Sequence, residues 1–294
     1  MPSVGGHLVA TYHYVRPRNS DGVTGVTPAE FRRQIRWLQA NYRVVSVDEY
    51  QARHLSDDRL ALVTFDDAVK DQWLFAAPIL DEFNVPATFF APMRPVSDEP
   101  DGWCTQHLLH ALAQHLGFAE LERRVDRALA ERGVAPIIDT FEMDRLYHYE
   151  TPRKRRLKYL MAFVLEQSQA HRILIQINAT VGIDHRDWFM SAQELTALQS
   201  AGHTLGGHGF DHLAYTTLDE AGQDRDMALA QLWMTRLFGA RPRPIAFPFG
   251  RADKTTFRLL VQHGYTTAFT TGNRVDAKDV GRLAIGAVTI KEAA

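Results

Sequence analysis

Short apolar runs rich in β-branched and aromatic residues alternate along this chain with stretches in which apolar residues recur every three or four positions. The first pair is a strand-like run at residues 8–15 and a helical stretch at residues 28–41, where Phe31, Ile35 and Leu38 are spaced by four and three. Such spacing places side chains on one face of a helix. The pattern therefore predicts a strand followed by an amphipathic helix.

The same alternation continues to the C-terminus. It predicts further strands at residues 60–65, 87–91, 204–207, 244–247, 266–270 and 282–288, and further helices at residues 70–83, 191–201, 219–238 and 253–263. Strands that alternate with helices form mainly parallel sheets. We therefore predict an α/β fold, a distorted or incomplete (β/α) barrel of mainly parallel strands.

The alternation lapses between residues 95 and 187, where the sequence is charge-rich and helical, for example at residues 121–132 and 152–167. A chain of 294 residues with 45% hydrophobic content can bury one sizeable core. We expect a single catalytic domain over residues 1–294 that contains a helical insertion at residues 95–187.

Charge and cysteine content narrow the classes of partner and ligand. The 33 basic and 35 acidic side chains give a formal net charge of -2, so nucleic acid polymers and anionic membrane surfaces are not expected partners. The single cysteine, Cys104, excludes an intramolecular disulfide and a cysteine-rich zinc site. Any metal must then be held by histidines and carboxylates.

The sequence says less about cellular location and oligomeric state. No apolar run approaches the roughly 20 residues that span a bilayer, and the N-terminus lacks the basic and apolar segments of a signal peptide. We expect a cytoplasmic protein without a transmembrane segment. Nothing in the sequence indicates an oligomeric state.

Two adjacent carboxylates, Asp66 and Asp67, follow the strand predicted at residues 60–65. In parallel α/β folds, catalytic groups project from the carboxyl ends of strands. Neighbouring side chains at such an end point in different directions, so one carboxylate can bind a metal while the other accepts a proton from water. The alternative is that both residues cap the following helix, which is a common place for Asp.

His208 and His212 follow the strand predicted at residues 204–207. Histidines four residues apart can converge on one metal ion, although this spacing alone is weak support. Together with a carboxylate at another strand end they make up the three-ligand set of catalytic zinc sites. We expect one divalent metal ion, with zinc favoured and cobalt, nickel and manganese also compatible with these ligands.

These residues carry a family resemblance. Thr-Phe-Asp-Asp at residues 64–67 and the two spaced histidines resemble the first two motifs of the polysaccharide deacetylase, or NodB-homology, family of carbohydrate esterases. Ala-Phe-Pro-Phe-Gly at residues 246–250 resembles the third motif of that family, which lines one side of the active-site groove. The resemblance covers residues 60–92, 188–270 and the N-terminal strand, and leaves the insertion outside it.

The chain departs from the family pattern at two places. Ala246 stands where the third motif has an arginine that pairs with the catalytic Asp. The family's usual catalytic acid is a histidine near the C-terminus, and residues 281–294 contain no histidine. Thr-Tyr-His-Tyr-Val at residues 11–15, however, resembles the N-terminal segment of a rearranged branch that includes exopolysaccharide N-deacetylases. In that branch the first strand supplies the acid, which makes His13 the candidate; a core histidine is the alternative. Arg282 is a hypothetical replacement for the arginine, and an ordinary surface arginine is the alternative.

The resemblance implies a role for each site residue. It implies metal ligands at Asp67, His208 and His212, a general base at Asp66, a general acid at His13, and groove and oxyanion contacts from Pro248 and the backbone N–H of Phe249. The implied reaction removes an N-acyl group, acetyl first, from an amino sugar that is free, nucleotide-linked or lipid-linked. The alternatives are removal of an N-formyl group and a carbohydrate-binding relative without turnover.

Three further features of the sequence have ordinary structural explanations. His107, His110 and His115 suggest a second metal but lie in a helical stretch without an acidic partner nearby. The basic run at residues 153–156, with Lys158, is typical of a solvated helix face and alternatively attracts a sugar phosphate. Trp103, Trp188 and Phe189 are candidates for stacking on a sugar ring or for burial in the core.

Overall fold

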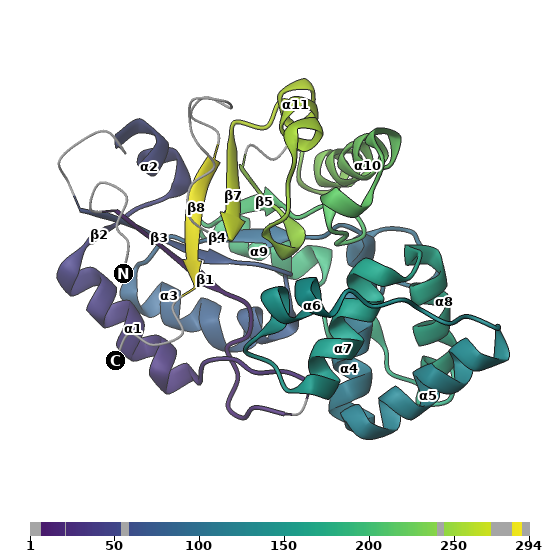
Figure 1. The fold of residues 1–294 in the computed structure, drawn as a ribbon. Helices are drawn as coiled ribbons and strands as arrows, with labels where there is room; N and C mark the ends of the chain where they lie inside the picture. Colours follow the sequence, from purple (N-terminus) through teal and green to yellow (C-terminus); the bar gives the residue numbers. More distant parts are fainter. Residues whose placement is uncertain (1–6, 21, 54–58, 240–243, 272–283, 290–294) are drawn as a thin grey trace. The chain divides into compact units, whose positions relative to one another are not determined.

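The structure, a computed structural model, describes residues 7–20, 22–53, 59–239, 244–271 and 284–289 (Figure 1). The chain divides into two compact units. The barrel unit comprises residues 1–18, 25–99 and 188–294, and the helical unit comprises residues 19–24 and 100–187.

The barrel unit contains an eight-stranded sheet in which every pairing is parallel. Its strands are β1 (Leu8–Tyr12), β2 (Arg43–Val44), β3 (Leu60–Phe65), β4 (Thr88–Ala91), β5 (Thr204–Gly207), β6 (Pro244–Ala246), β7 (Thr267–Thr271) and β8 (Ala284–Thr289). The order is β1-β8-β7-β6-β5-β4-β3-β2, and an additional β1–β3 pairing joins the two sides of the sheet. The sheet therefore curls into a distorted barrel, and the predicted fold class is confirmed.

Helices of the barrel unit follow the strands along the chain. They are α1 (Pro28–Asn41), α2 (Val47–Arg53), α3 (Ala77–Phe83), α9 (Ala192–Ser200), α10 (Glu220–Phe238) and α11 (Lys254–Gln262). Phe31 of α1 shows how a predicted apolar face is buried: its ring lies 4.9 Å from the Tyr12 ring of β1 and 5.7 Å from the Phe65 ring of β3, centroid to centroid. Fully burying such a side chain is worth roughly 1.5–3 kcal/mol.

Local signals set the helix starts. Thr27 and Glu30 form a capping box at the start of α1, where Pro28 occupies the first turn, and Ser191 and Glu194 form another at α9. The helix predicted at residues 70–83 is present but irregular. It contains a π-helical turn, η1 (Gln72–Ala76), which continues into α3. Seven residues of α2 and two of β2 were not predicted.

The helical unit contains α4 (Thr105–Leu116), α5 (Phe118–Glu131), α6 (Thr140–Tyr147), α7 (Pro152–Tyr159) and α8 (Gln167–Asn178). The helical sequence at residues 152–167 forms α7 followed by a π-helical segment, η3 (Leu160–Val164), after which Leu165 is extended. Glu166 then caps α8 through the backbone N–H groups of Ser168 and Gln169. Within the described residues, every helix is too short or too polar to cross a membrane.

Candidate metal centre and active site

The turn after β3 places two carboxylates in a buried position. All six residues of β3 are buried, and Asp66 and Asp67 remain 7% and 5% exposed. Asp67 and Ala68 both have positive φ, 78° and 51°, so the chain reverses sharply before the helical segment that contains η1. The residue at the N-cap position of that helix is Asp71 and not either of the two carboxylates. The helix-capping alternative is therefore wrong.

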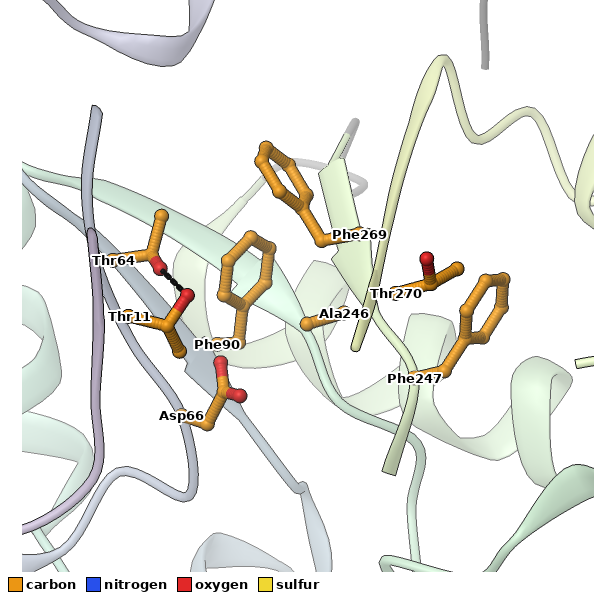
Figure 2. A pocket seen from close by; sticks show the side chains of 8 residues that line it. All are labelled: Thr11, Thr64, Asp66, Phe90, Ala246, Phe247, Phe269 and Thr270. Carbon is orange, nitrogen blue, oxygen red and sulfur yellow. Dashed lines mark hydrogen bonds between the residues drawn. The ribbon is translucent and has the colours of Figure 1, made fainter. Parts of the chain in front are cut away.

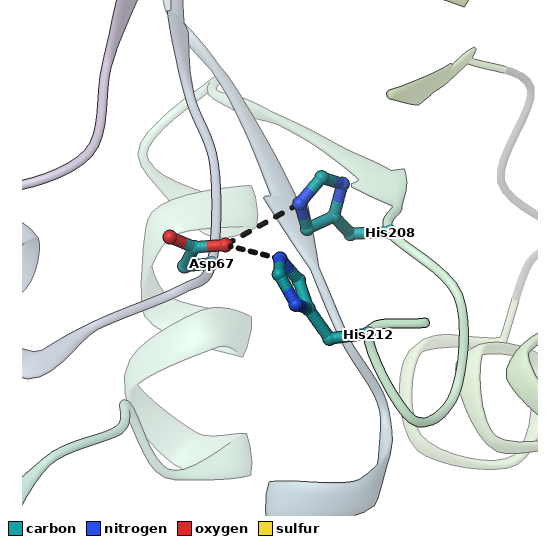
Figure 3. Close-up of side chains that lie close together, drawn as sticks. All are labelled: Asp67, His208 and His212. Atoms are coloured by element: carbon teal, nitrogen blue, oxygen red, sulfur yellow. Dashed lines mark ion pairs between the residues drawn. The ribbon is translucent and has the colours of Figure 1, made fainter. Parts of the chain in front are cut away.

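The loop after β5 brings two imidazoles to Asp67 (Figure 3). His208 Nε2 lies 3.3 Å and His212 Nε2 lies 3.1 Å from Asp67 Oδ1. The other ring nitrogen of His208, Nδ1, lies 2.8 Å from the backbone oxygen of Ala246, and donation to this oxygen leaves Nε2 to face the carboxylate. His212 reaches the same point from a left-handed backbone, with φ 56°.

These three side chains fit a divalent metal. One ligand atom from each lies within 4.8 Å of the others, and all three residues are buried. Within the described part of the chain this is the one group of three or more such side chains that could hold an ion. Two imidazoles and one carboxylate are a common ligand set of catalytic zinc, with a fourth position left for water or substrate.

The electrostatics of the centre come from burial and charge pairing. Burial raises the pKa of Asp66, while His208 and His13 act in the opposite direction. For His208, burial lowers the pKa, but the carboxylates of Asp67 and Asp66 outweigh it and raise the pKa above its ordinary value. The buried charges therefore depend on one another for stabilisation.

His13 follows the last residue of β1. Its Nε2 lies 3.8 Å from Asp66 Oδ2, and its side chain is 42% exposed. This exposure does not fit the core-histidine alternative. The imidazole is thus beside the second carboxylate and within reach of solvent.

The third-motif segment lies near the same centre. Pro248 and Phe249 belong to a short turn, η6 (Pro248–Gly250), and the Phe249 ring lies 5.1 Å from the His212 ring, centroid to centroid. Ala246 lines a small cavity together with Asp66, as Figure 2 shows. Asp66 Oδ1 is buried there and accepts no hydrogen bond from the described residues. Arg282 lies outside the described residues.

The basic run on α7 is paired within the helical unit: Arg153 and Arg156 bind Glu122, Arg155 binds Asp144 and Lys158 binds Glu150. This pairing leaves little charge to attract a phosphate. Trp188 and Tyr14 are in edge-to-face contact at 6.2 Å. Trp103 and Phe189 are each 2% exposed, which favours burial over stacking on a sugar.

Two buried polar residues near the centre were not predicted from the sequence. Gln72 binds backbone oxygens at the ends of β1 and β3, and Asp226 of α10 binds the loop that carries His212. No local pattern marks either residue, because each acts on the backbone of a distant segment.

A buried Asp-His-His centre at the strand ends of a parallel α/β barrel is an arrangement that can hold a divalent metal ion. The family model described as polysaccharide deacetylase matches residues 154–268, a segment that includes both histidines and the third-motif turn. The matched segment comprises 115 of the 294 residues and is similar to that family.

Individual relatives are distant in sequence. YxkH of Bacillus subtilis, whose name assigns it to the polysaccharide deacetylases, is 22% identical over 127 residues, which span 43% of this chain and 44% of YxkH. IcaB from Ammonifex degensii is 18% identical with a TM-score of 0.58, covering 97% of this chain and 92% of IcaB. The Streptococcus pyogenes deacetylase PplD, solved with acetate, is 15% identical with a TM-score of 0.59, covering 96% and 91%. These structures share the fold.

Proposed function

We propose that this protein is a metal-dependent hydrolase that removes the N-acetyl group from an amino sugar. The observation that carries the proposal is the convergence of three metal-type ligands with a second carboxylate and an exposed imidazole at one edge of the barrel. The family match and the likeness to solved deacetylases support the same reaction class.

Asp67, His208 and His212 would hold the ion, with zinc our first choice. When bound, a divalent ion lowers the pKa of water and polarises the substrate carbonyl. Asp66 takes a proton from the attacking water as the new C–O bond forms. The backbone N–H of Phe249 contributes to stabilising the oxyanion.

His13 completes the reaction as general acid. It donates a proton to the sugar nitrogen as the C–N bond breaks, so the products are acetate and a free amino sugar. Its position beside Asp66 at the end of β1 supports this role and agrees with a rearranged branch of the family, in which the first strand supplies the acid.

Substitutions separate the proposed roles. Asp66→Ala should retain the metal and lose about 100-fold or more in turnover, because the base is absent. His208→Ala should lose both metal and turnover, because a ligand is absent. His13→Ala should slow the reaction about as severely as Asp66→Ala while metal content stays near one per chain.

Metal analysis and acetate release on a panel of N-acetylated sugars would measure these effects, with Asp98→Ala as control, since this carboxylate is 76% exposed and pairs with Arg236. A fully active Asp66→Ala protein would overturn the base assignment. Release of formate from N-formylated sugars, with no acetate from N-acetylated ones, would show that the acyl group removed is formyl and not acetyl. Bound metal without either product would favour the carbohydrate-binding alternative.

A further inference from the structure

A buried carboxamide links the strand ends that carry the proposed acid and base. Gln72 is 0% exposed and stands at the start of the π-helical turn η1. Its Nε2 donates to the backbone oxygen of Asp66 at 2.5 Å and to that of His13 at 2.7 Å. Its Oε1 accepts no hydrogen bond from the described residues, so the side chain acts as a donor. One amide group thus binds both catalytic segments.

The β1–β3 ladder ends just before these two residues. The last paired positions are Tyr12 and Phe65, and one further backbone bond joins Asp66 N to Tyr12 O at 3.0 Å. His13 and Asp66 lie beyond the regular pairing, where strand geometry no longer fixes the spacing of the two chains. The Gln72 carboxamide bridges them at this point.

The segment that Gln72 holds is also strained. Asp67 and Ala68 are consecutive non-glycine residues with positive φ. A left-handed residue with a side chain is sterically unfavourable and persists only where its surroundings hold it. The backbone N–H of Met190 binds Ala68 O at 2.9 Å on the far side of the turn. Gln72 holds the other side of the turn, through the backbone oxygen of Asp66.

We propose that Gln72 is a positioning residue that sets the separation between the His13 imidazole and the Asp66 carboxylate. The inference rests on the proposed function. A displacement of about 1 Å at a reacting group can cost about 100-fold in rate. Without the carboxamide, the residues beyond the last ladder pair lose this bridge, and the spacing between the His13 and Asp66 side chains is less restricted.

Gln72→Met keeps the length of the side chain and removes both donated hydrogen bonds. We expect kcat to fall about 10- to 100-fold with KM within about threefold and metal content unchanged. Gln72→Glu should lose at least as much, because an ionised carboxylate would face two backbone oxygens. Gln231→Met is the matched control: buried Gln231 donates to the backbone oxygen of His263, away from the centre. This control should lose similar stability and keep kcat.

Crystal structures of metal-loaded wild-type and Gln72→Met proteins give a readout that does not depend on turnover. We expect the His13 Nε2 to Asp66 Oδ2 separation to grow beyond 3.8 Å in the variant. An active wild type with an equally active Gln72→Met protein and an unchanged separation would overturn the positioning role alone. A wild type that cleaves no N-acyl sugar would overturn the proposed function, while a changed separation would still support Gln72 as the residue that spaces the two side chains.

Discussion

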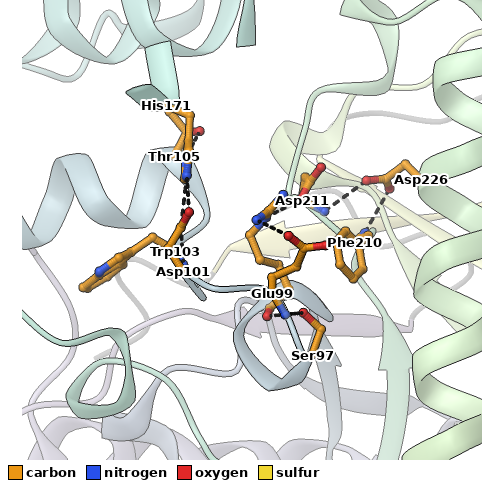
Figure 4. Close-up of polar contacts among 10 residues, drawn as sticks. Ser97, Glu99, Asp101, Trp103, Thr105, His171, Phe210, Asp211 and Asp226 are labelled. Carbon is orange, nitrogen blue, oxygen red and sulfur yellow. Dashed lines mark hydrogen bonds and ion pairs between the residues drawn. The ribbon is translucent and has the colours of Figure 1, made fainter. Parts of the chain in front are cut away.

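The Asp226 carboxylate binds the backbone of the loop between His208 and His212. It accepts hydrogen bonds from the backbone N–H groups of Phe210 and Asp211, each at 3.0 Å (Figure 4). It also accepts a hydrogen bond from the Tyr215 hydroxyl at 3.0 Å. Gly209 has φ 72°, and a side chain there would lie 2.8 Å from Asp226 Oδ2. The carboxylate therefore selects both the conformation of the loop and the glycine within it.

Burial raises the pKa of Asp226 to about 6 despite these three donors, from an ordinary value of 3.8. Between these two pKa values the folded protein holds the proton and the unfolded chain releases it. The free energy of unfolding contributed by this group therefore falls as pH rises from about 4 to about 6, by up to roughly 3 kcal/mol.

Asp226→Asn should remove this part of the pH dependence. Urea unfolding between pH 4 and 7, with a chelator present so that metal binding does not contribute, would measure it as the difference between wild type and variant. The exposed Asp98→Asn should leave the wild-type slope unchanged. A difference between wild type and Asp226→Asn that stays constant with pH would show that Asp226 titrates normally.

The sequence predicts the Asp-His-His group better than the residues that support it. Asp67 and His208 stand within two residues of strand ends, and His212 lies four residues after His208. Parallel strands bring their carboxyl ends to one edge, so local pattern and topology suffice. Gln72 and Asp226 lie within helical elements and act through backbone atoms of other segments. Their roles depend on tertiary contacts that no spacing along the chain encodes.

At the level of secondary structure, the turn between β3 and η1 is where the chain departs most from the predicted pattern. The periodicity of residues 70–83 indicates an ordinary α-helix, but residues 72–76 are π-helical. Apolar spacing does not distinguish these two hydrogen-bond patterns, and π-turns are frequent at functional sites. Strand β2 has two residues, too few to show a period.

Ala68 gives a direct test of strain in this turn. Ala68→Gly should raise the free energy of unfolding by about 1 kcal/mol, because glycine adopts φ 51° without the steric cost of a side chain. The same substitution in a regular helix, Ala197→Gly in α9, should lower it by about as much. Chemical denaturation would compare the two. Destabilisation of both variants by equal amounts would show that the turn is not strained at Ala68.

At the scale of the whole molecule, the alternation of strands and helices predicts the fold class better than it predicts where each element begins and ends. It correctly indicates a parallel sheet that curls toward a barrel. The β1–β3 pairing that joins its two sides is a long-range contact, so the strand order could not be predicted from the sequence. The sequence also could not show whether the basic run at residues 153–156 is free to attract a phosphate. Its partners, Glu122, Asp144 and Glu150, come from other parts of the helical unit.

Charge balance and ligand chemistry together predict how the protein responds to loss of its metal. The centre buries two carboxylates and two imidazoles, and three of these four groups are the proposed ligands. Without the ion, water at the site keeps its ordinary pKa and Asp66 has no activated proton to accept. Turnover should therefore depend on the ion even where the fold persists.

The most direct measurement is acetate release from the panel of N-acetylated sugars before chelation, after chelation, and after zinc is restored. We expect the protein to bind one metal ion per chain, to lose acetate release when the ion is removed, and to regain it with zinc. Acetate release that survives complete removal of the metal, or no release from any sugar by the metal-loaded protein, would contradict the account.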